Sequence, residues 1–313
     1  GFSYISGMHF RYSIKIVLSM LVSVPVLGQS PLQYRYEDII AQEEPEESVS
    51  ISPLKRYKSQ ALQRLGVSSG YVQGLASKNS HKWLQAEVGV GVPLGSFSNI
   101  LSARFIFRED SITVPSLNFR HNHLYQLGAS LFWRKEFTDD VNRSMLISVQ
   151  PRYQGDMEAE SNTFGIFAMC LINRKIPDTG MTFSYGLVHL NHLDNAIFPA
   201  LGISWQPEYS TKIDLRFPES AVSWLLVRES NQMEKWLRLK VGFEGNRWGV
   251  NLDGVDTIVT SRHWKTAVVL EKLLAGGGGW TVELSYLFAR EFEIGRDFSD
   301  LGDGVYLSCG INY

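Results

Sequence analysis

Histidine is the residue type whose spacing in this chain comes closest to that of a chemical site. There are two pairs, His121-Asn122-His123 and His189-Leu190-Asn191-His192. In the first pair the two imidazoles would share one face of a β-strand, because alternate residues of a strand point to the same side. Two histidines alone are weak support for a metal ion, so loop or interface positions are the favoured interpretation.

Other residues with chemical potential carry no recognisable motif. The sequence lacks the Ser/His or carboxylate/His motifs of a membrane phospholipase or protease. Gly276–Gly279 is not followed by the Lys-Ser/Thr pair of a phosphate-binding loop and is interpreted as an inter-strand loop. Cys170 and Cys309 form no CxxC pair, and a disulfide between them is unsupported. We predict no catalytic residue, no cofactor and no metal site.

Charged residues are left as candidates, and they recur at alternate positions of apolar segments. Leu101, Ala103, Phe105 and Phe107 alternate with Ser102, Arg104 and Arg108. A strand with this pattern has one oily face and one polar face. If the polar faces turn inward, they would line an aqueous path or pair across it. The residues that this parity assigns to the interior are Glu87, Arg104, Arg108, Arg134, Asp214, Arg216, Arg238, Lys240, Glu244, Lys265 and Glu283.

The same alternation runs through residues 81 to 313. It predicts an all-β, antiparallel transmembrane β-barrel of about 12 strands, within a range of 10 to 14. Many of the segments have the 9 to 11 residues that a tilted strand needs to cross a bilayer. Two candidates, Ile213–Phe217 and Ala221–Val227, are shorter. Gly245-Asn246 is predicted to be the tip of a hairpin between Leu237–Phe243 and Trp248–Leu252.

A soluble β-sandwich also alternates, and aromatic residues help to separate the two folds. Tryptophans recur near predicted strand ends, as the two aromatic girdles of a membrane barrel require. The predicted girdle residues are Trp83, Trp133, Trp205, Trp248, Trp264 and Trp280. By the same parity Cys170 and Cys309 fall on the apolar face, where we expect them to be buried as small hydrophobic side chains.

The N-terminal part predicts export. Met8 is followed by Arg11 and Lys15 and then by the apolar run Ile16–Leu27. This run resembles the core of a cleaved signal peptide and is too short for a membrane-spanning helix, so we predict cleavage after Gly28. Residues 1–28 are therefore assigned to an upstream extension and signal peptide. Residues 29–80, in which acidic and basic stretches are segregated, are predicted to be a flexible periplasmic leader with one short helix near Ser59–Leu65.

The final segment alternates up to its last residue, with Val305, Leu307, Cys309, Ile311 and Tyr313 on one face. An amphipathic strand with a terminal aromatic residue is typical of the signal by which the insertion machinery recognises outer-membrane barrels. We predict that Val305, Leu307, Ile311 and Tyr313 form this assembly signal.

Residues 198 to 313 also resemble an uncharacterised, domain-of-unknown-function family of bacterial outer-membrane β-barrel proteins found in planctomycetes, verrucomicrobia and relatives. The resemblance rests on the segments FPALGISWQPEYSTKIDLRFPES, WTVELSYLFAREFEIG and GVYLSCGINY. It implies a barrel of unknown role in the outer membrane of a Gram-negative bacterium, and it brings no catalytic residue with it.

The sequence thus predicts a barrel in contact with outer-membrane lipid and with the insertion machinery. A net charge of -2 disfavours nucleic acid as a partner. The first functional hypothesis is a narrow, porin-like channel for small hydrophilic solutes. The second is a non-conducting structural or adhesion barrel, and an outer-membrane hydrolase is the third.

Overall fold

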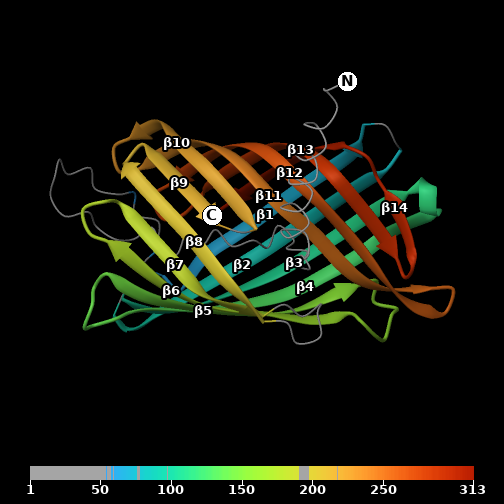
Figure 1. The fold of residues 1–313 in the computed structure, drawn as a ribbon, viewed down its shortest axis with the longest axis horizontal. Helices are drawn as coiled ribbons and strands as arrows, with labels where there is room; N and C mark the ends of the chain where they lie inside the picture. The colour runs from blue at the N-terminus through green and yellow to red at the C-terminus, as the bar shows by residue number, and fades with distance from the viewer. Residues whose placement is uncertain are drawn as a thin grey trace, which may run out of the picture.

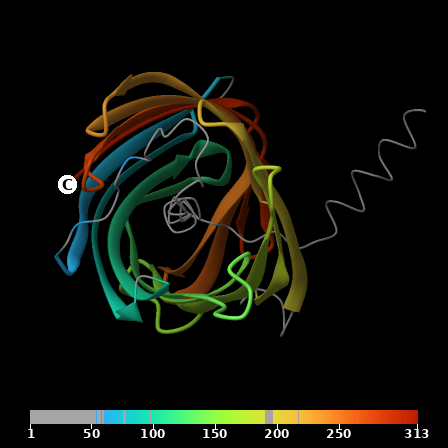
Figure 2. The same cartoon turned by 90° about the vertical axis from the view of Figure 1, so that its left-hand side faces the viewer.

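The protein is a closed barrel of antiparallel strands. The computed structural model describes Leu54, Lys58 and residues 60–75, 78–96, 98–189, 197–216 and 218–313. Fourteen of the fifteen strands in these residues form the barrel wall, and the short β14 pairs with β13 alone. Figure 1 shows the tilted strands from the side, and Figure 2 shows the ring they form. The predicted fold class is confirmed, and the strand number lies at the upper limit of the predicted range.

The strands follow the chain around the wall. Their bounds are β1 Leu62–Gly74, β2 Ser80–Ser96, β3 Asn99–Val114, β4 Phe119–Glu136, β5 Arg143–Gly155, β6 Phe164–Ile176, β7 Met181–His189, β8 Ile197–Glu208, β9 Thr211–Arg216, β10 Glu219–Glu229, β11 Met233–Leu252, β12 Val255–Leu274, β13 Gly279–Ile294, β14 Asp297–Asp300 and β15 Gly304–Asn312. One 3₁₀ turn, η1 (Pro115–Leu117), joins β3 to β4. No described helix is long and apolar enough to span a membrane.

Pairing of β1 with β15 closes the wall, and it corrects the predicted start of the barrel. Residues Gly66 to Gly74 are in antiparallel register with Asn312 to Gly304. The prediction had placed this segment in the leader and had put a short helix near Ser59–Leu65. It was wrong because serine and glycine occupy both faces of β1 and hide its alternation; only Leu65, Val67 and Tyr71 mark the outer face.

The rest of the predicted N-terminal segments lies outside the described residues, except for a few positions. Leu54 is one of them, and it is buried against Trp236 and Leu273. That residue at least is packed rather than solvated, which differs from the flexible leader predicted there.

The β11–β12 hairpin corrects a second prediction. β11 runs without interruption through Gly245 and Asn246, which pair with Arg262 and Ser261 on β12. The turn lies instead at Asp253-Gly254, where φ is +53° and +84°. Two consecutive positive φ values are what a two-residue type I′ hairpin turn requires. Because no turn interrupts β11, Trp248 and Val250 share the face of Glu244 and point inward.

The outer face of the barrel is apolar. Leu84, Phe105, Leu239 and Leu284 are each 45 to 54% exposed, whereas their alternate neighbours, such as Glu87 and Glu283, are 8% exposed. The C-terminal β15 follows the same rule, with Val305, Leu307, Cys309, Ile311 and Tyr313 exposed. An apolar exterior around a polar interior is the arrangement of a membrane barrel, and not of a sandwich with an oily core.

The tryptophans divide between the two faces. Trp133, Trp205, Trp264 and Trp280 lie on the outer parity, and the first, second and fourth of these are near strand ends. Trp83 and Trp248 are 7% and 0% exposed and point inward, so their assignment to the girdle is wrong. Trp83 shares its parity with Gln85 and Glu87 and fills the space beside Gly70, where a Cβ would lie 2.5 Å from the indole nitrogen. Cys170 and Cys309 are exposed on the outer face rather than buried.

The two ends of the barrel differ. The end at which β1 starts and β15 stops, here called the terminal end, also carries the turns after β2, β4, β6, β8, β10 and β12. The opposite end carries the β1–β2, β3–β4, β5–β6, β7–β8, β9–β10, β11–β12 and β13–β14 connections, and is called the closed end (Figure 1, where β14 is labelled). β11 extends ten residues beyond its pairing with β10, from Phe243 to Leu252, so the wall is much higher here than along β6–β10.

Candidate functional site

The interior face collects the charged side chains that the sequence singled out. Glu87, Arg108, Arg134, Asp214, Arg238, Lys265 and Glu283 are 1 to 8% exposed. Arg104, Arg216, Lys240 and Glu244 are half-buried on the same face. Inward placement follows from strand geometry, since each alternates with an outward apolar residue.

Lys265 on β12 is the centre of the largest group of charges. Its ammonium lies 2.5 Å from a carboxylate oxygen of Glu244 and 2.8 Å from one of Glu283. Lys240 lies 3.9 Å from Glu283 and 3.2 Å from Glu219. Each charge of this cluster therefore has at least one partner of opposite sign, which offsets the cost of removing it from water.

Glu87 forms a second group with two guanidinium groups. It accepts hydrogen bonds from Arg64 on β1 and from Arg104 on β3. The three strands are neighbours, so the carboxylate links them on the interior face.

A third group surrounds Asp110, which is fully buried. Arg108 donates to Asp110 at 2.6 and 2.9 Å, His81 lies at 2.7 Å and Gln126 donates at 3.1 Å. The amide of Gln126 also reaches the Asn246 side chain on β11 at 3.4 Å. That contact crosses the barrel interior, since β4 and β11 are not neighbours in the wall.

The other predicted interior charges are also paired. Arg238 lies 3.6 Å from Glu271, Asp214 lies 3.3 Å from Arg216, and Arg134 donates to Glu136 at 2.9 Å. The interior is thus a mixed-charge surface held in ion pairs, and not a field of one sign.

The first histidine pair does not form a joint site. His121 lies 3.5 Å from Asp156, while His123 pairs with Glu109 at 2.7 Å on an exposed part of β4. In the second pair, His189 ends β7 and His192 lies outside the described residues. Among the residues that the structure describes, no group of three or more His, Cys, Asp or Glu could hold a metal ion.

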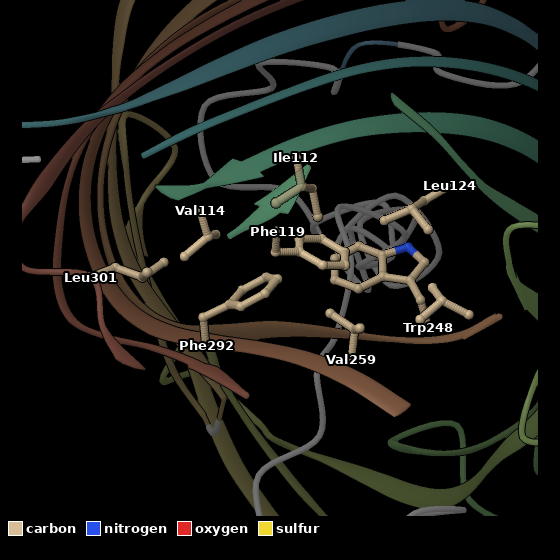
Figure 3. Close-up of a cluster of buried hydrophobic side chains, with 9 residues drawn as sticks. Ile112, Val114, Phe119, Leu124, Trp248, Val259, Phe292 and Leu301 are labelled. Carbon is tan, nitrogen blue, oxygen red and sulfur yellow. The ribbon is translucent and has the colours of Figure 1, made fainter. Parts of the chain in front are cut away.

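An apolar core fills the interior at the closed end, a feature that the sequence did not predict. It consists of Ile112, Val114, Phe119, Leu124, Trp248, Val250, Val259, Phe292 and Leu301, all at most 6% exposed. Figure 3 shows side chains from the β3–β4 wall meeting those from β11, β12 and β13. Phe119 and Phe292, from opposite walls, have ring centroids 5.3 Å apart.

The β5–β6 connection, residues 156–163, crosses to this core and is here called the strap. Gly155 pairs with Gly249 on β11, which lies six places away in the sheet order. Close approach requires both glycines: a Cβ on Gly155 would lie 2.7 Å from the Gly249 carbonyl oxygen, and one on Gly249 would lie 2.8 Å from that of Ser161. This contact closes a smaller ring of nine strands, β1–β5, β11–β13 and β15, and leaves β6–β10 outside it.

Two carboxylates fasten the strap. Asp156 accepts hydrogen bonds from the backbone N–H groups of Glu158 and Ala159 at 2.9 Å and of Asn251 at 2.7 Å. Asp256, at the β11–β12 tip, accepts from the backbone of Glu160 and Ser161 at 3.0 and 2.8 Å. Burial alone would raise the pKa of Asp156, but these N–H groups and the nearby His121 hold it below the usual value of an aspartate.

Sequence reasoning missed three participants in the interior. Asp110 and Arg152 lie on the inward parity of β3 and β5, so alternation could have identified both. The apolar core could not have been found in this way, because its residues alternate like those of a lipid-facing strand. Alternation does not distinguish contact with lipid from contact with the apolar core. The height of each residue along the barrel axis does, and it is known only from the structure.

These features define the class of the protein as an antiparallel transmembrane β-barrel with a charged interior. No family model and no curated protein match the chain, so membership of the family that it resembles stays a prediction. Solved structures with similar architecture include a KdgM porin in complex with disordered oligogalacturonate (7% identity, TM-score 0.33, covering 80% of this chain and 98% of that one). Others are the translocator domain of autotransporter NalP from Neisseria meningitidis (12%, 0.36, 82% and 89%) and an anion-selective porin from Comamonas acidovorans (10%, 0.29, 80% and 98%). Similarity at this level carries no argument about activity.

Proposed function

We propose that the protein is an outer-membrane channel of the porin type for small hydrophilic solutes, with the charged interior as its filter. One observation carries the proposal: several paired charges remain open to solvent on the interior side. The side chains of Glu219, Arg216 and Arg64 are 24, 26 and 35% exposed although they face inward. A barrel that served only as an anchor has no need of hydrated charges inside its wall.

The difference between the ends supports an orientation. Membrane barrels of bacteria have short periplasmic turns and longer extracellular connections. The turns at the terminal end have two to six residues, whereas the two longest connections of the closed end, the strap and the β7–β8 connection, have eight and seven. We therefore place the terminal end, with the predicted leader, on the periplasmic side and the closed end outside.

This orientation can be tested with single cysteines in a background that lacks Cys170 and Cys309. Met157→Cys, in the strap, should react with an impermeant maleimide on intact cells. Val141→Cys, in the β4–β5 turn of the terminal end, should react only after the outer membrane is permeabilised. The reverse pattern would overturn the orientation, and recovery of the protein outside the outer-membrane fraction would overturn the location.

Conductance across a planar bilayer tests the channel itself. Purified protein of native heat-modifiable mobility should produce discrete current steps. Contact with lipid and with the insertion machinery belongs to the same proposal, since a barrel of this kind must be inserted before it conducts.

The apolar core supports a second candidate, a non-conducting structural barrel. Its residues and the strap occupy the closed end, so a solute cannot leave the interior there without displacing them. Insertion without current in the wild type, and in variants that release the strap, would favour this candidate over the channel. We do not propose an enzymatic activity.

A further inference from the structure

Arg152 on β5 is an interior charge without a partner among the residues that the structure describes. It is 8% exposed and points inward, yet within the described residues its guanidinium has no ion pair and no hydrogen bond. Buried cations are ordinarily paired, because an isolated charge away from bulk water is costly. The interior cations at Lys265 and Arg108 obey this rule, so the exception at Arg152 requires an explanation.

The wall around Arg152 lacks side chains where a ligand would need room. The residue directly opposite on β4 is Gly128, and the one directly opposite on β6 is Gly165. The guanidinium is therefore flanked on both neighbouring strands by positions without a side chain. Arginine presents a planar set of donors that matches the two oxygens of a carboxylate.

Apolar side chains begin next to this position. Phe167 follows Gly165 on the same face of β6, so it is the diagonal neighbour of Arg152, about 7–8 Å away. Phe167 packs with Met169, Val188 and Phe198 in one cluster. Met169, Val188 and Phe198 occupy successive strands in register, so the cluster extends across β6, β7 and β8, about 5 Å per strand.

The same place is where the interior becomes closed. Two residues beyond Arg152, Gln154 pairs with Gln126, and Gln126 reaches Asn246 on the far wall. Gly155 then meets Gly249. A solute that moves along the interior from the terminal end would stop at Arg152, beneath the strap and the apolar core.

We propose that Arg152 binds the carboxylate of a small organic acid, whose apolar body lies on Phe167, Met169, Val188 and Phe198. The cluster spans about 10 Å across three strands, which suits a chain of five to eight carbons or a single aromatic ring. If the barrel is a channel, small organic acids are the class of solute that it carries, and this part rests on the proposed function. Binding to Arg152 does not, because it can be measured without transport.

Titration calorimetry on the folded, full-length barrel in non-ionic detergent tests the proposal with hexanoate, acetate and hexylammonium as probes. We expect hexanoate to bind about tenfold or more tightly than acetate, since it buries additional methylenes, and we expect no binding of hexylammonium. Arg152→Gln should weaken hexanoate binding by about tenfold or more, the effect of losing a hydrogen bond to a charged group. Arg120→Gln, which removes an exposed arginine on β4, should leave it unchanged.

A second variant separates the two halves of the site. Phe198→Ser should reduce hexanoate affinity toward that of acetate and leave acetate binding unaltered. Each variant is compared at native heat-modifiable mobility, so a folding defect is recognised as such. Equal hexanoate affinity in wild type and Arg152→Gln, or binding of hexylammonium, would overturn the proposal. Equal affinity for acetate and hexanoate would overturn its apolar half.

Failure of the site and failure of the channel give different results. Arg152-dependent binding of hexanoate by a barrel that carries no current keeps the site and refutes the channel. Current without hexanoate binding keeps the channel and refutes the site.

Discussion

At the scale of single residues, the interior charges matter through their partners more than through their signs. Lys265 lies between Glu244 and Glu283 and is 4% exposed. Removing it leaves two carboxylates close together with less compensation. Breaking a buried pair in this way is far more costly than replacing the whole pair by apolar residues, because the uncompensated charge stays buried.

We expect Lys265→Met to lower the free energy of unfolding by about 3–5 kcal/mol. Urea unfolding of the refolded barrel in detergent micelles measures the change. Lys135→Met, at an exposed position of β4, is the matched control and should change stability little. A Lys265→Met variant as stable as the wild type would show that the ion pairs around it are not structural.

The assignment of side chains to the inner and outer faces can be tested on two adjacent residues of β13. Leu284 is 54% exposed on the outer face and Glu283 points inward. Leu284→Arg should cost about 2–4 kcal/mol if the site lies near the middle of the membrane. Glu283→Gln keeps an oxygen acceptor for Lys265, which retains Glu244, so its effect should be the smaller of the two. Equal losses in refolding yield and stability would contradict the assigned faces.

At the scale of elements, the strap and the β11–β12 hairpin form one unit at the closed end. Gly155 and Gly249 permit backbone contact. Asp156 of the strap accepts a hydrogen bond from the Asn251 N–H on β11, and Asp256 accepts one from the Ser161 N–H of the strap. The unit joins residues about 95 positions apart in the chain.

Gly249→Val should detach the strap without unfolding the barrel. A Cβ at this position would lie 2.8 Å from the Ser161 carbonyl oxygen and from the Thr163 methyl group. Such overpacking costs about 1–3 kcal/mol, which should speed cleavage after Glu158 and Glu160 by a glutamate-specific protease roughly 5- to 150-fold. Gly91→Ala, whose nearest contact is a flexible side chain at 3.3 Å, should leave the cleavage rate unchanged. Equal rates in both variants would show that the strap is not held by this contact.

Docking of the strap should also depend on pH. The pKa of Asp156 is lowered in the folded protein, although burial opposes this, because three backbone N–H groups and His121 favour the carboxylate. A depressed pKa stabilises the docked strap fully above the ordinary aspartate value of about 4 and ceases to do so as the pH falls through the lowered pKa. Hydrogen exchange at the Asn251 amide, corrected for its intrinsic pH dependence, should accelerate over that acidic range. In Asp156→Asn the acceleration should be absent; its persistence would assign the effect to another group.

At the scale of the whole molecule, two rings share one wall. Fourteen strands enclose the charged interior, and nine of them continue to the closed end around an apolar core. Within the described residues, the pair Gly155–Gly249 is the only strand pairing between β5 and β11, and it completes the smaller ring next to the strap. A solute that leaves the interior at the closed end must therefore displace both this link and the apolar core.

The combined variant Asp156→Ala/Asp256→Ala should raise channel activity in planar bilayers. Without either carboxylate the strap N–H groups lose their acceptors, and the β5–β11 contact is weakened. We expect more frequent or larger current steps than in the wild type, with unchanged heat-modifiable mobility. Identical conductance in both proteins would place the barrier in the apolar core or remove the strap from the path.

The sequence by itself determined the fold class and the facing of most strands. Period-two alternation is a local property of a strand with one face in lipid, so Leu84, Phe105 and Leu284 could be assigned outward, and Glu87, Lys265 and Glu283 inward, from spacing alone. Alternation by itself also predicts that Trp83 faces inward. Its assignment to the aromatic girdle was made on residue type and overrode that prediction. β1 was not predicted as a strand, because its serines and glycines give little difference in polarity between the two faces.

Only the tertiary structure decided what lies at the closed end. Trp248 and Val250 read locally like lipid-facing residues, and their environment depends on where β11 rises above β10 and meets the opposite wall. The lack of a partner for Arg152 among the described residues could also not be predicted, because alternation does not state which side chains of other strands an interior charge reaches. Alternation predicts whether a side chain faces inward or outward. Its neighbours depend on the position of its strand around the barrel and on its height along the axis, which only the tertiary structure gives.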